Sequence, residues 1–405
     1  MGTCRWSGKA PLHWTSRSNW AGDSEPGIKT GAMGTPDILN FGGKRLDELY
    51  NTTGSRDAVF AYLQSVIDNY ATLNPRISDA TKEQLEIIKD QIELLSLPSG
   101  AEYMGADMDP DPQHIRRELD PVWPATKGKP SDKERKGYSM FKVLANAGHS
   151  WAVYTGDDKR RYWNQYDLLG LFLSKMGPAP GGSVADQSNF YLPLTAVYAK
   201  FCLWIGGKQI PTMKGAEKQS KKGTGTGDPP ACFQCTWNSD TGDFFLGASL
   251  AGIRVTGSTK PYGAWENKVM EARWNLLNNN FFEFPGDWGP FQEKKSPVIS
   301  YQGKTTLFGN CGETYPFLEI ISPHVTDDKV RAQTRGLALG KSFAGVAEYN
   351  EDSFAPMLIP PCLNCQLLLL FAGISDVTHF TLNSRMKTPL FPTPVAGYWE
   401  PDSEN

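Results

Sequence analysis

Cysteine, long hydrophobic runs and a net charge of either sign are all scarce in this chain, and each shortage excludes a class of protein. Seven cysteines among 405 residues, an odd number, do not make a disulfide-stabilised scaffold and favour reduced thiols. The longest apolar run, residues 367–372, is far shorter than the roughly 20 residues that a helix needs to cross a bilayer. We therefore expect neither a disulfide framework nor a transmembrane segment.

The charge balance limits the expected binding partners, and the first residues indicate the expected cellular location. The 41 lysines and arginines nearly match the 44 aspartates and glutamates, for a formal charge of −3. This balance excludes a strongly basic protein that wraps nucleic acid, although it allows a local basic patch. Residues 1–20 contain no apolar core of a secretory signal, so we expect an intracellular protein, cytoplasmic or nuclear, without a membrane partner.

Histidine is rare as well, with five in the chain. His149, His324 and His379 have no metal-ligand spacing to another histidine or cysteine. We expect them to be ordinary surface or core residues.

Composition divides the chain into segments. Residues 1–45 are rich in Gly, Ser, Thr and Lys and are expected to form a disordered or loosely ordered arm. Residues 46–205 are expected to be mainly helical, with a proline-rich linker near 100–136. A flexible basic loop is predicted at 206–230, and residues 386–405 form a tail.

Apolar residues at helical spacing predict the helices of the first half. Ser55 is a plausible N-cap for one helix, and a second begins at about Thr81 after the interruption at Asn74-Pro75. Further helices are predicted at 160–176 and 190–205. No internal repeat is present.

After Pro230 the pattern changes toward strands. Residues 233–237 and 244–246 predict two strands around a tight turn. A helix is predicted at 265–277, and short strand-like pieces occur at 298–301 and 305–308.

The basic loop has two interpretations. Its residues Lys214, Lys218, Lys221 and Lys222 precede a Gly-Thr-Gly-Thr-Gly run. The ordinary interpretation is a solvated loop; the functional one is a contact to a nucleic-acid strand or a phosphate group.

The chemistry-bearing pattern is C-x-E followed by P-C-x-x-C. Cys362 and Cys365 lie one turn apart at the start of a predicted helix that runs through Phe371, so both sulfurs can point at one metal ion. Cys311 lies at the start of another predicted helix, which runs over 313–321, and can supply a third ligand. Three protein ligands leave the fourth tetrahedral position of Zn²⁺ open to water, as in catalytic rather than structural zinc sites.

Glu313 follows Cys311 by two residues, and would lie near a metal without binding it. A carboxylate in that position can take a proton from water and pass it to a ring nitrogen and to a departing amine. A nearby glutamate that is not a ligand, followed by P-C-x-x-C, is the signature of zinc deaminases.

This pattern resembles the cytidine-deaminase superfamily, in particular its all-cysteine branch, and Asn-Cys-Gly-Glu-Thr-Tyr-Pro is similar to deaminase-like proteins of fungi. The resemblance covers about residues 231–385. It implies Zn²⁺ on Cys311, Cys362 and Cys365, with Glu313 as the proton shuttle. The implied reaction is hydrolytic loss of ammonia from an amino-heterocycle, with cytosine- or cytidine-type bases leading.

The resemblance also implies an architecture. An α/β domain would hold a mixed sheet with the two ligand-bearing helices on one face, each helix followed by a strand, with candidates at 335–343 and 374–382. A mainly helical region precedes this domain. The step of 51 residues from Cys311 to Cys362 is long for the family, so an insertion is expected at 323–355.

The substrate form stays open between a free nucleoside or nucleotide and a single-stranded nucleic acid, as does the oligomeric state. Asn310, which directly precedes Cys311, is a candidate substrate-binding residue together with the four lysines of the basic loop.

The main alternative is a structural zinc site. Cys232 and Cys235 could join Cys362 and Cys365 in a Cys4 site that stabilises a non-enzymatic scaffold or interaction protein. Two observations disfavour it. The first pair lies in a predicted strand, where residues i and i+3 point to opposite faces, and Glu313 would have no role.

Overall fold

The two strands expected after Pro230 lie in the central sheet, and nearly all of their residues are buried. The computed structural model describes residues 37–73, 79–96, 154–156, 160–206, 229–250, 272–278, 308–322, 327–374 and 377–380. Their largest sheet has four strands in the order β6-β5-β7-β8. These strands are β5 (Cys232–Asn238), β6 (Phe244–Ala248), β7 (Thr334–Gly340) and β8 (Leu358–Ile359).

The hairpin of β5 and β6 closes through a turn that the sequence specifies locally. The Asn238 side chain accepts hydrogen bonds from the backbone N–H groups of Asp240 and Thr241. Gly242 adopts a positive φ of 77°, which a residue with a side chain rarely takes. The predicted hairpin is therefore confirmed.

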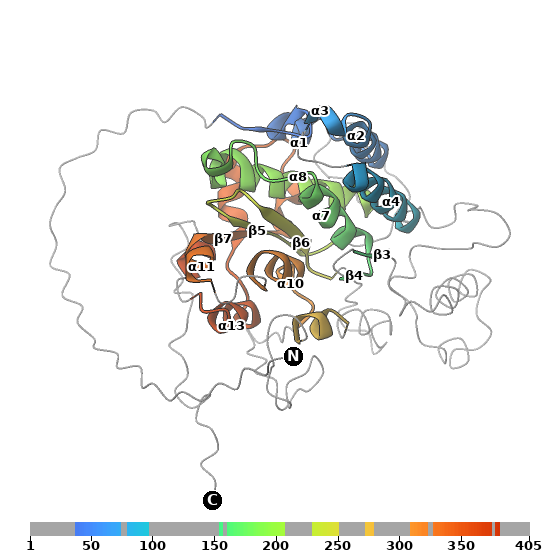
Figure 1. Cartoon of the computed structure of the whole chain (residues 1–405). Coiled ribbons are helices and arrows are strands. Elements are labelled where there is room, and N and C mark those ends of the chain that lie inside the picture. The colour runs from blue at the N-terminus through green and yellow to red at the C-terminus, as the bar shows by residue number, and fades with distance from the viewer. Residues whose placement is uncertain are drawn as a thin grey trace, which may run out of the picture. The chain divides into compact units, whose positions relative to one another are not determined.

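Helices cover one face of the sheet with a continuous apolar layer. Helices α7 (Gln165–Lys175) and α8 (Leu192–Ile205) lie on this face, above the sheet in Figure 1. The ring of Tyr198 meets Phe233 edge-on at 5.9 Å, and Tyr191 stacks on Trp237 at 4.1 Å. Helix α8 is buried almost all round, so it is apolar on nearly every side.

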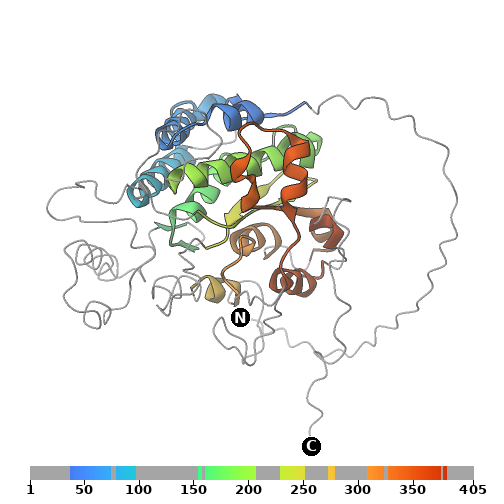
Figure 2. The same cartoon turned by 180° about the vertical axis from the view of Figure 1, so that it is seen from behind.

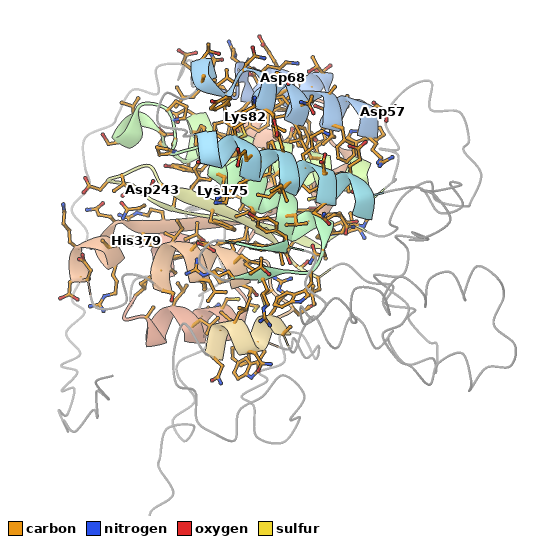
Figure 3. All side chains as sticks on the ribbon, turned by 45° about the vertical axis from the view of Figure 1, so that its right-hand side comes forward. Asp57, Asp68, Lys82, Lys175, Asp243 and His379 are labelled. Atoms are coloured by element: carbon orange, nitrogen blue, oxygen red, sulfur yellow. The ribbon has the colours of Figure 1, made fainter. Side chains whose placement is uncertain are left out.

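A second layer of helices packs on α7 and α8. Helices α4 and α7, α1 and α8, and α2 and α8 are in contact. Asp57 and Asp68 lie on the solvent side of α2 (Figure 3). These outer helices are α1 (Leu46–Thr52), α2 (Arg56–Asp68), α3 (Tyr70–Leu73) and α4 (Asp79–Leu95).

The helices predicted from Ser55 and from about Thr81 are confirmed as α2 and α4. The Ser55 side chain accepts a hydrogen bond from the N–H of Ala58, which satisfies a free donor at the start of α2. Those predicted at 160–176 and 190–205 are confirmed as α7 and α8.

The helices that carry the cysteines lie on the opposite face of the sheet, below it in Figure 1 and again in the reverse view of Figure 2. They are α10 (Thr314–Pro316), which continues as the π-helix η4 (Phe317–Ile321), and α13 (Leu363–Phe371). Strands β3 (Tyr154–Thr155) and β4 (Arg161–Tyr162) form a small hairpin beside η4, and Tyr162 stacks on Tyr315 at 4.5 Å.

The remaining described elements are short. They comprise β1 (Asn40–Phe41), β2 (Lys44–Arg45), η2 (Gly182–Val184), η3 (Gln187–Tyr191), α11 (Asp328–Gln333), η6 (Lys341–Gly345), α12 (Glu351–Phe354), η7 (Ala355–Met357) and η8 (Val377–Phe380). Among the described helices, none is both long enough and apolar enough to cross a membrane.

The mixed helix-and-sheet class is as expected, but three details differ. All pairings among the described strands are antiparallel, so the sheet is not mixed in these residues. Val377–Phe380, inside the strand expected at 374–382, is a 3-10 helix, because Phe380 turns back to pack edge-on against Phe317. The segment 323–355 is no peripheral insertion, because it contains β7, which pairs with β5 along its whole length.

The expected arm also contains structure at its end. Residues 40–45 form the β1–β2 hairpin, whose turn is made by Gly42 and Gly43 at positive φ. Phe41 is buried against Phe190 and Phe244, which holds the hairpin in place. The predictions at 1–36, 100–136, 207–228, 298–301, 305–307 and 386–405 lie outside the described residues, whereas 272–278 is helical as expected.

A buried cation in α8 generates a pH prediction. Lys200 is fully buried, donates a hydrogen bond to the Tyr50 carbonyl, and lies 4.1 Å from the centroid of the Tyr50 ring. Burial lowers the pKa of Lys200 to about 8. In an unfolded chain the pKa of lysine is about 10.4.

Between these two pKa values the unfolded chain binds more protons than the folded one, so the free energy of unfolding rises with pH. The free energy of unfolding of the parent, relative to that of Lys200→Met, should therefore increase by on the order of 1–3 kcal/mol between about pH 7 and about pH 10. Urea unfolding of both proteins across this range measures the difference, with the exposed Lys341→Met as the control for lost charge. A difference that stays constant with pH contradicts the prediction.

Candidate metal centre

A tight turn delivers Cys311 and Glu313 to the start of α10. Gly309 has a positive φ of 81°, and the Asn310 carbonyl accepts a hydrogen bond from the N–H of Leu250. The Cys311 carbonyl then accepts hydrogen bonds from both the N–H and the Oγ1 of Thr314. These contacts fix the backbone that carries the first cysteine, and they tie it to the end of the β5–β6 hairpin.

Cys362 and Cys365 lie at the start of α13, as the sequence predicts. The N–H of Gln366 bonds to the Cys362 carbonyl, which closes the first turn of the helix. The Gln366 side chain donates to the Pro361 carbonyl at 2.8 Å, so the loop before the helix is held as well. The two thiols are thereby placed on one side of the helix start.

The fold brings the three cysteines together. The Sγ of Cys362 lies 3.3 Å from that of Cys311 and 3.5 Å from that of Cys365. All three sulfurs are within 4.8 Å of one another, the one group in the described part of the chain that could hold a metal ion. Tetrahedral Zn–S bonds of about 2.3 Å place sulfurs about 3.8 Å apart, so the group fits such an ion after small shifts.

The acidities of these thiols follow from their mutual contacts. Hydrogen bonding with the Cys311 and Cys365 thiols lowers the pKa of Cys362 well below its usual value. The hydrogen bond with Cys362 raises the pKa of Cys311, and burial raises that of Cys365. Cys362 is therefore the first of the three to ionise, and the other two lose their protons when a metal binds, because metals bind thiolates.

Glu313 is buried next to this cluster. Only 4% of its surface is exposed. Burial and then the negative charge at Cys362 raise the pKa of Glu313 to about 8, although a backbone hydrogen bond, a hydrogen bond with Cys365 and the charge of Arg273 act to lower it. Its carboxyl group can therefore exchange a proton near neutral pH.

Arg273 was not predicted as a functional residue from the sequence. It lies in the helix 272–278, is fully buried, and donates from Nη2 to the carbonyls of Cys311 at 2.6 Å and Ala248 at 3.2 Å. Its Nη1 lies 3.6 Å from Oδ2 of the buried Asp167. No local pattern marks Arg273, because its partners come from distant parts of the chain.

A glycine allows the sheet to approach the cysteine turn. A Cβ on Gly247 would lie 2.3 Å from the Gly312 carbonyl oxygen and 2.6 Å from Cδ of Pro316. Both distances are shorter than contacts that real atoms make, so a side chain at 247 would push the turn away from β6.

The Cys4 alternative is wrong for a geometric reason. Strand β5 alternates, so Cys235 points to the α8 face, where its thiol bonds to Thr195. Cys232 lies on the other face of the sheet. Burial raises its pKa most, and the negative charges of Glu313 and Cys362 raise it further. Cys235 therefore cannot join Cys362 and Cys365 in one site.

The other candidate residues are placed as follows. Asn310 is half-buried beside Cys311, and the four lysines of the basic loop lie outside the described residues, as do His149 and His324. His379 (Figure 3) contacts Arg335, with 2.9 Å between Nδ1 and Nη1. The metal-ligand group in the described residues comprises only the three cysteines, so His379 is not a member.

Two cavities in the described part of the chain lie away from the cysteines. One of about 630 Å³ is lined by the β1–β2 hairpin and residues 176–182. The other, about 330 Å³, is lined by Tyr162, Lys175 and Glu319 among others. Neither is lined by the cysteine cluster or by Glu313.

Comparisons with protein-family models, with curated proteins and with solved structures find no match to this chain.

The cluster predicts a specific pattern of metal loss. Cys311→Ser, Cys362→Ser and Cys365→Ser should each weaken zinc binding by about 100-fold or more, because each removes one of three thiolates. Cys235→Ser should keep about the parent's affinity, because its thiol faces α8. The zinc content of each purified variant and its competition with a chelator for zinc measure these affinities. Loss of metal from a folded Cys235→Ser protein would contradict the assignment.

Proposed function

We propose that this chain is a zinc-dependent hydrolytic deaminase that acts on an amino-heterocycle and is similar to the cytidine-deaminase superfamily. The observation that carries the proposal is the buried Glu313, two residues from Cys311 and beside three clustered thiols. A structural zinc site gives no reason to bury an acidic group at this position, because burial of an ionisable carboxyl is costly.

The order of the elements supports the proposal. A strand hairpin, β5–β6, precedes the first ligand helix α10, and β7 follows and pairs with β5. The second ligand helix, α13, comes next, on the same face of the sheet as α10 (Figures 1 and 2). This order agrees with the arrangement that the resemblance implies, which differs in two respects: the described strands pair only antiparallel, and the described residues contain no strand after α13.

The donor set favours zinc. Three cysteine sulfurs are soft ligands, which suit Zn²⁺ and leave one tetrahedral position free. When bound, zinc would supply Lewis acidity that makes water a nucleophile at neutral pH.

The chain's own residues supply the proton transfers. With its pKa raised to about 8, Glu313 is suited both to accept a proton and to return it, although a bound cation would lower this pKa. Its carboxylate would take one proton from the attacking water and deliver it to the ring nitrogen. It would then take the second proton from the hydroxyl group of the resulting adduct and deliver it to the amine, which leaves as ammonia while the carbonyl forms. Burial around Glu313 limits competing proton exchange with solvent.

The substrate class follows the resemblance. Cytosine- or cytidine-type bases are proposed, as a free nucleoside or nucleotide or within a single strand. Asn310 adjoins the cluster and is a candidate for contact with the base. The six cysteines of the described residues are all free, which suits a reducing, intracellular compartment.

Glu313→Gln tests the proposal, because it keeps the shape of the side chain and removes the base. We expect zinc to stay bound and turnover to fall by about 10²–10⁴-fold. The assay is ammonia release from cytosine, cytidine, cytidine nucleotides and single-stranded oligonucleotides. Glu319→Gln, which changes a carboxyl group in the adjoining η4, is the matched control and should retain turnover.

Two results would overturn the proposal. One is full turnover by Glu313→Gln on a substrate that the parent deaminates. The other is a zinc-loaded parent that releases no ammonia from any of these substrates, which would leave a zinc-stabilised, non-enzymatic protein.

A further inference from the structure

Arg273 is buried at the point where three separate parts of the fold meet. Its Nη2 joins the end of β6, through the Ala248 carbonyl, to the start of α10, through the Cys311 carbonyl. Its guanidinium lies 5.5 Å from the centroid of the Tyr315 ring, in the same short helix. Its contacts therefore surround the turn that carries Cys311 and Glu313.

We propose that Arg273 is a positioning residue that fixes the Cys311–Glu313 turn, and that Asp167 of α7 holds Arg273 in place. The proposal rests on the proposed function, since it assigns a role in that same site. Under this proposal α7, from the first half of the chain, contributes to the geometry of the metal centre.

The hydrogen bonds show how the turn is fixed. The Cys311 carbonyl accepts from Arg273 Nη2 at 2.6 Å and from Thr314 Oγ1 at 2.9 Å. Held from two sides, the peptide between Cys311 and Gly312 cannot rotate freely. Its orientation sets where the Cys311 sulfur points and where the backbone of Glu313 begins.

Asp167 supplies the other half of the arrangement. Its Oδ2 lies 3.6 Å from Arg273 Nη1 and accepts from Asn164 Nδ2 at 2.5 Å. Asn164 Oδ1 in turn accepts from the N–H groups of Tyr166 and Asp167 at the start of α7. The carboxylate, fixed at a capped helix end, thus forms a buried ion pair with Arg273 without a direct hydrogen bond.

Arginine suits this geometry, because Nη2 donates to both carbonyls while Nη1, on the same planar group, faces the Asp167 carboxylate at 3.6 Å. The single ammonium of lysine cannot reproduce this fork.

The experiment compares Arg273→Met, Arg273→Lys and Asp167→Asn with the parent. Lys200→Met is the control, because it removes another fully buried cation that donates to a carbonyl, in α8. The first readout is the visible absorption spectrum of the cobalt-substituted proteins, which reports the geometry of the thiolate ligands without any turnover. The second is kcat and KM on a substrate that the parent deaminates, with chelator competition for zinc affinity.

We expect both Arg273 variants to change the cobalt spectrum and to lower kcat by about 10–100-fold, with a smaller change in KM. Asp167→Asn should act in the same direction. The kcat of the double variant Asp167→Asn/Arg273→Met should be no lower than that of Arg273→Met alone, because both substitutions disrupt the same ion pair. Lys200→Met should alter the stability while leaving the spectrum and kcat as in the parent.

A parent-like cobalt spectrum in Arg273→Met overturns the inference, whatever the activity. If Arg273→Met does not fold, a parent-like spectrum in Arg273→Lys has the same meaning. If the parent releases no ammonia, the proposed function fails, yet the cobalt spectra still decide whether Arg273 positions the turn.

Discussion

Three thiols and one carboxyl group share a small buried volume, and their electrostatics constrain the structure around them. The Cys362 sulfur lies within 3.5 Å of two others, and Glu313 is 4% exposed beside them. Acidic groups this close cannot all ionise in a buried site unless a cation compensates them. The cluster thus fits a metal centre better than a group of ordinary core cysteines, whose thiols stay protonated and apart.

The sheet positions this centre by close packing. Strand β6 approaches the Cys311 turn so closely that Gly247 has no room for a side chain. The start of helix α13 brings Cys362, which lies 51 residues after Cys311, to the same point together with Cys365. The distances between sulfurs therefore depend on how two helix starts pack on one sheet face, and protein interiors transmit any change in such packing.

The helical first half of the chain takes part in the same arrangement. Helices α7 and α8 cover the opposite face of the sheet, and Asp167 of α7 pairs with Arg273, which contacts the Cys311 carbonyl. All described residues fall within one compact unit, Asp37–Asn405. Contacts in that half can therefore alter the geometry of the cysteines without touching them.

The sequence by itself determined what depends on neighbouring residues. It specified the starts of α10 and α13, the C-x-E and P-C-x-x-C spacings, and the hairpin after Pro230, because a helix turn or a tight turn needs only a few adjacent residues. Only the tertiary structure decided that Cys235 faces α8, that Val377–Phe380 coils instead of extending, and that Arg273 reaches Cys311. Each of these depends on partners far away along the chain, and local propensity holds no information about which distant residues will meet.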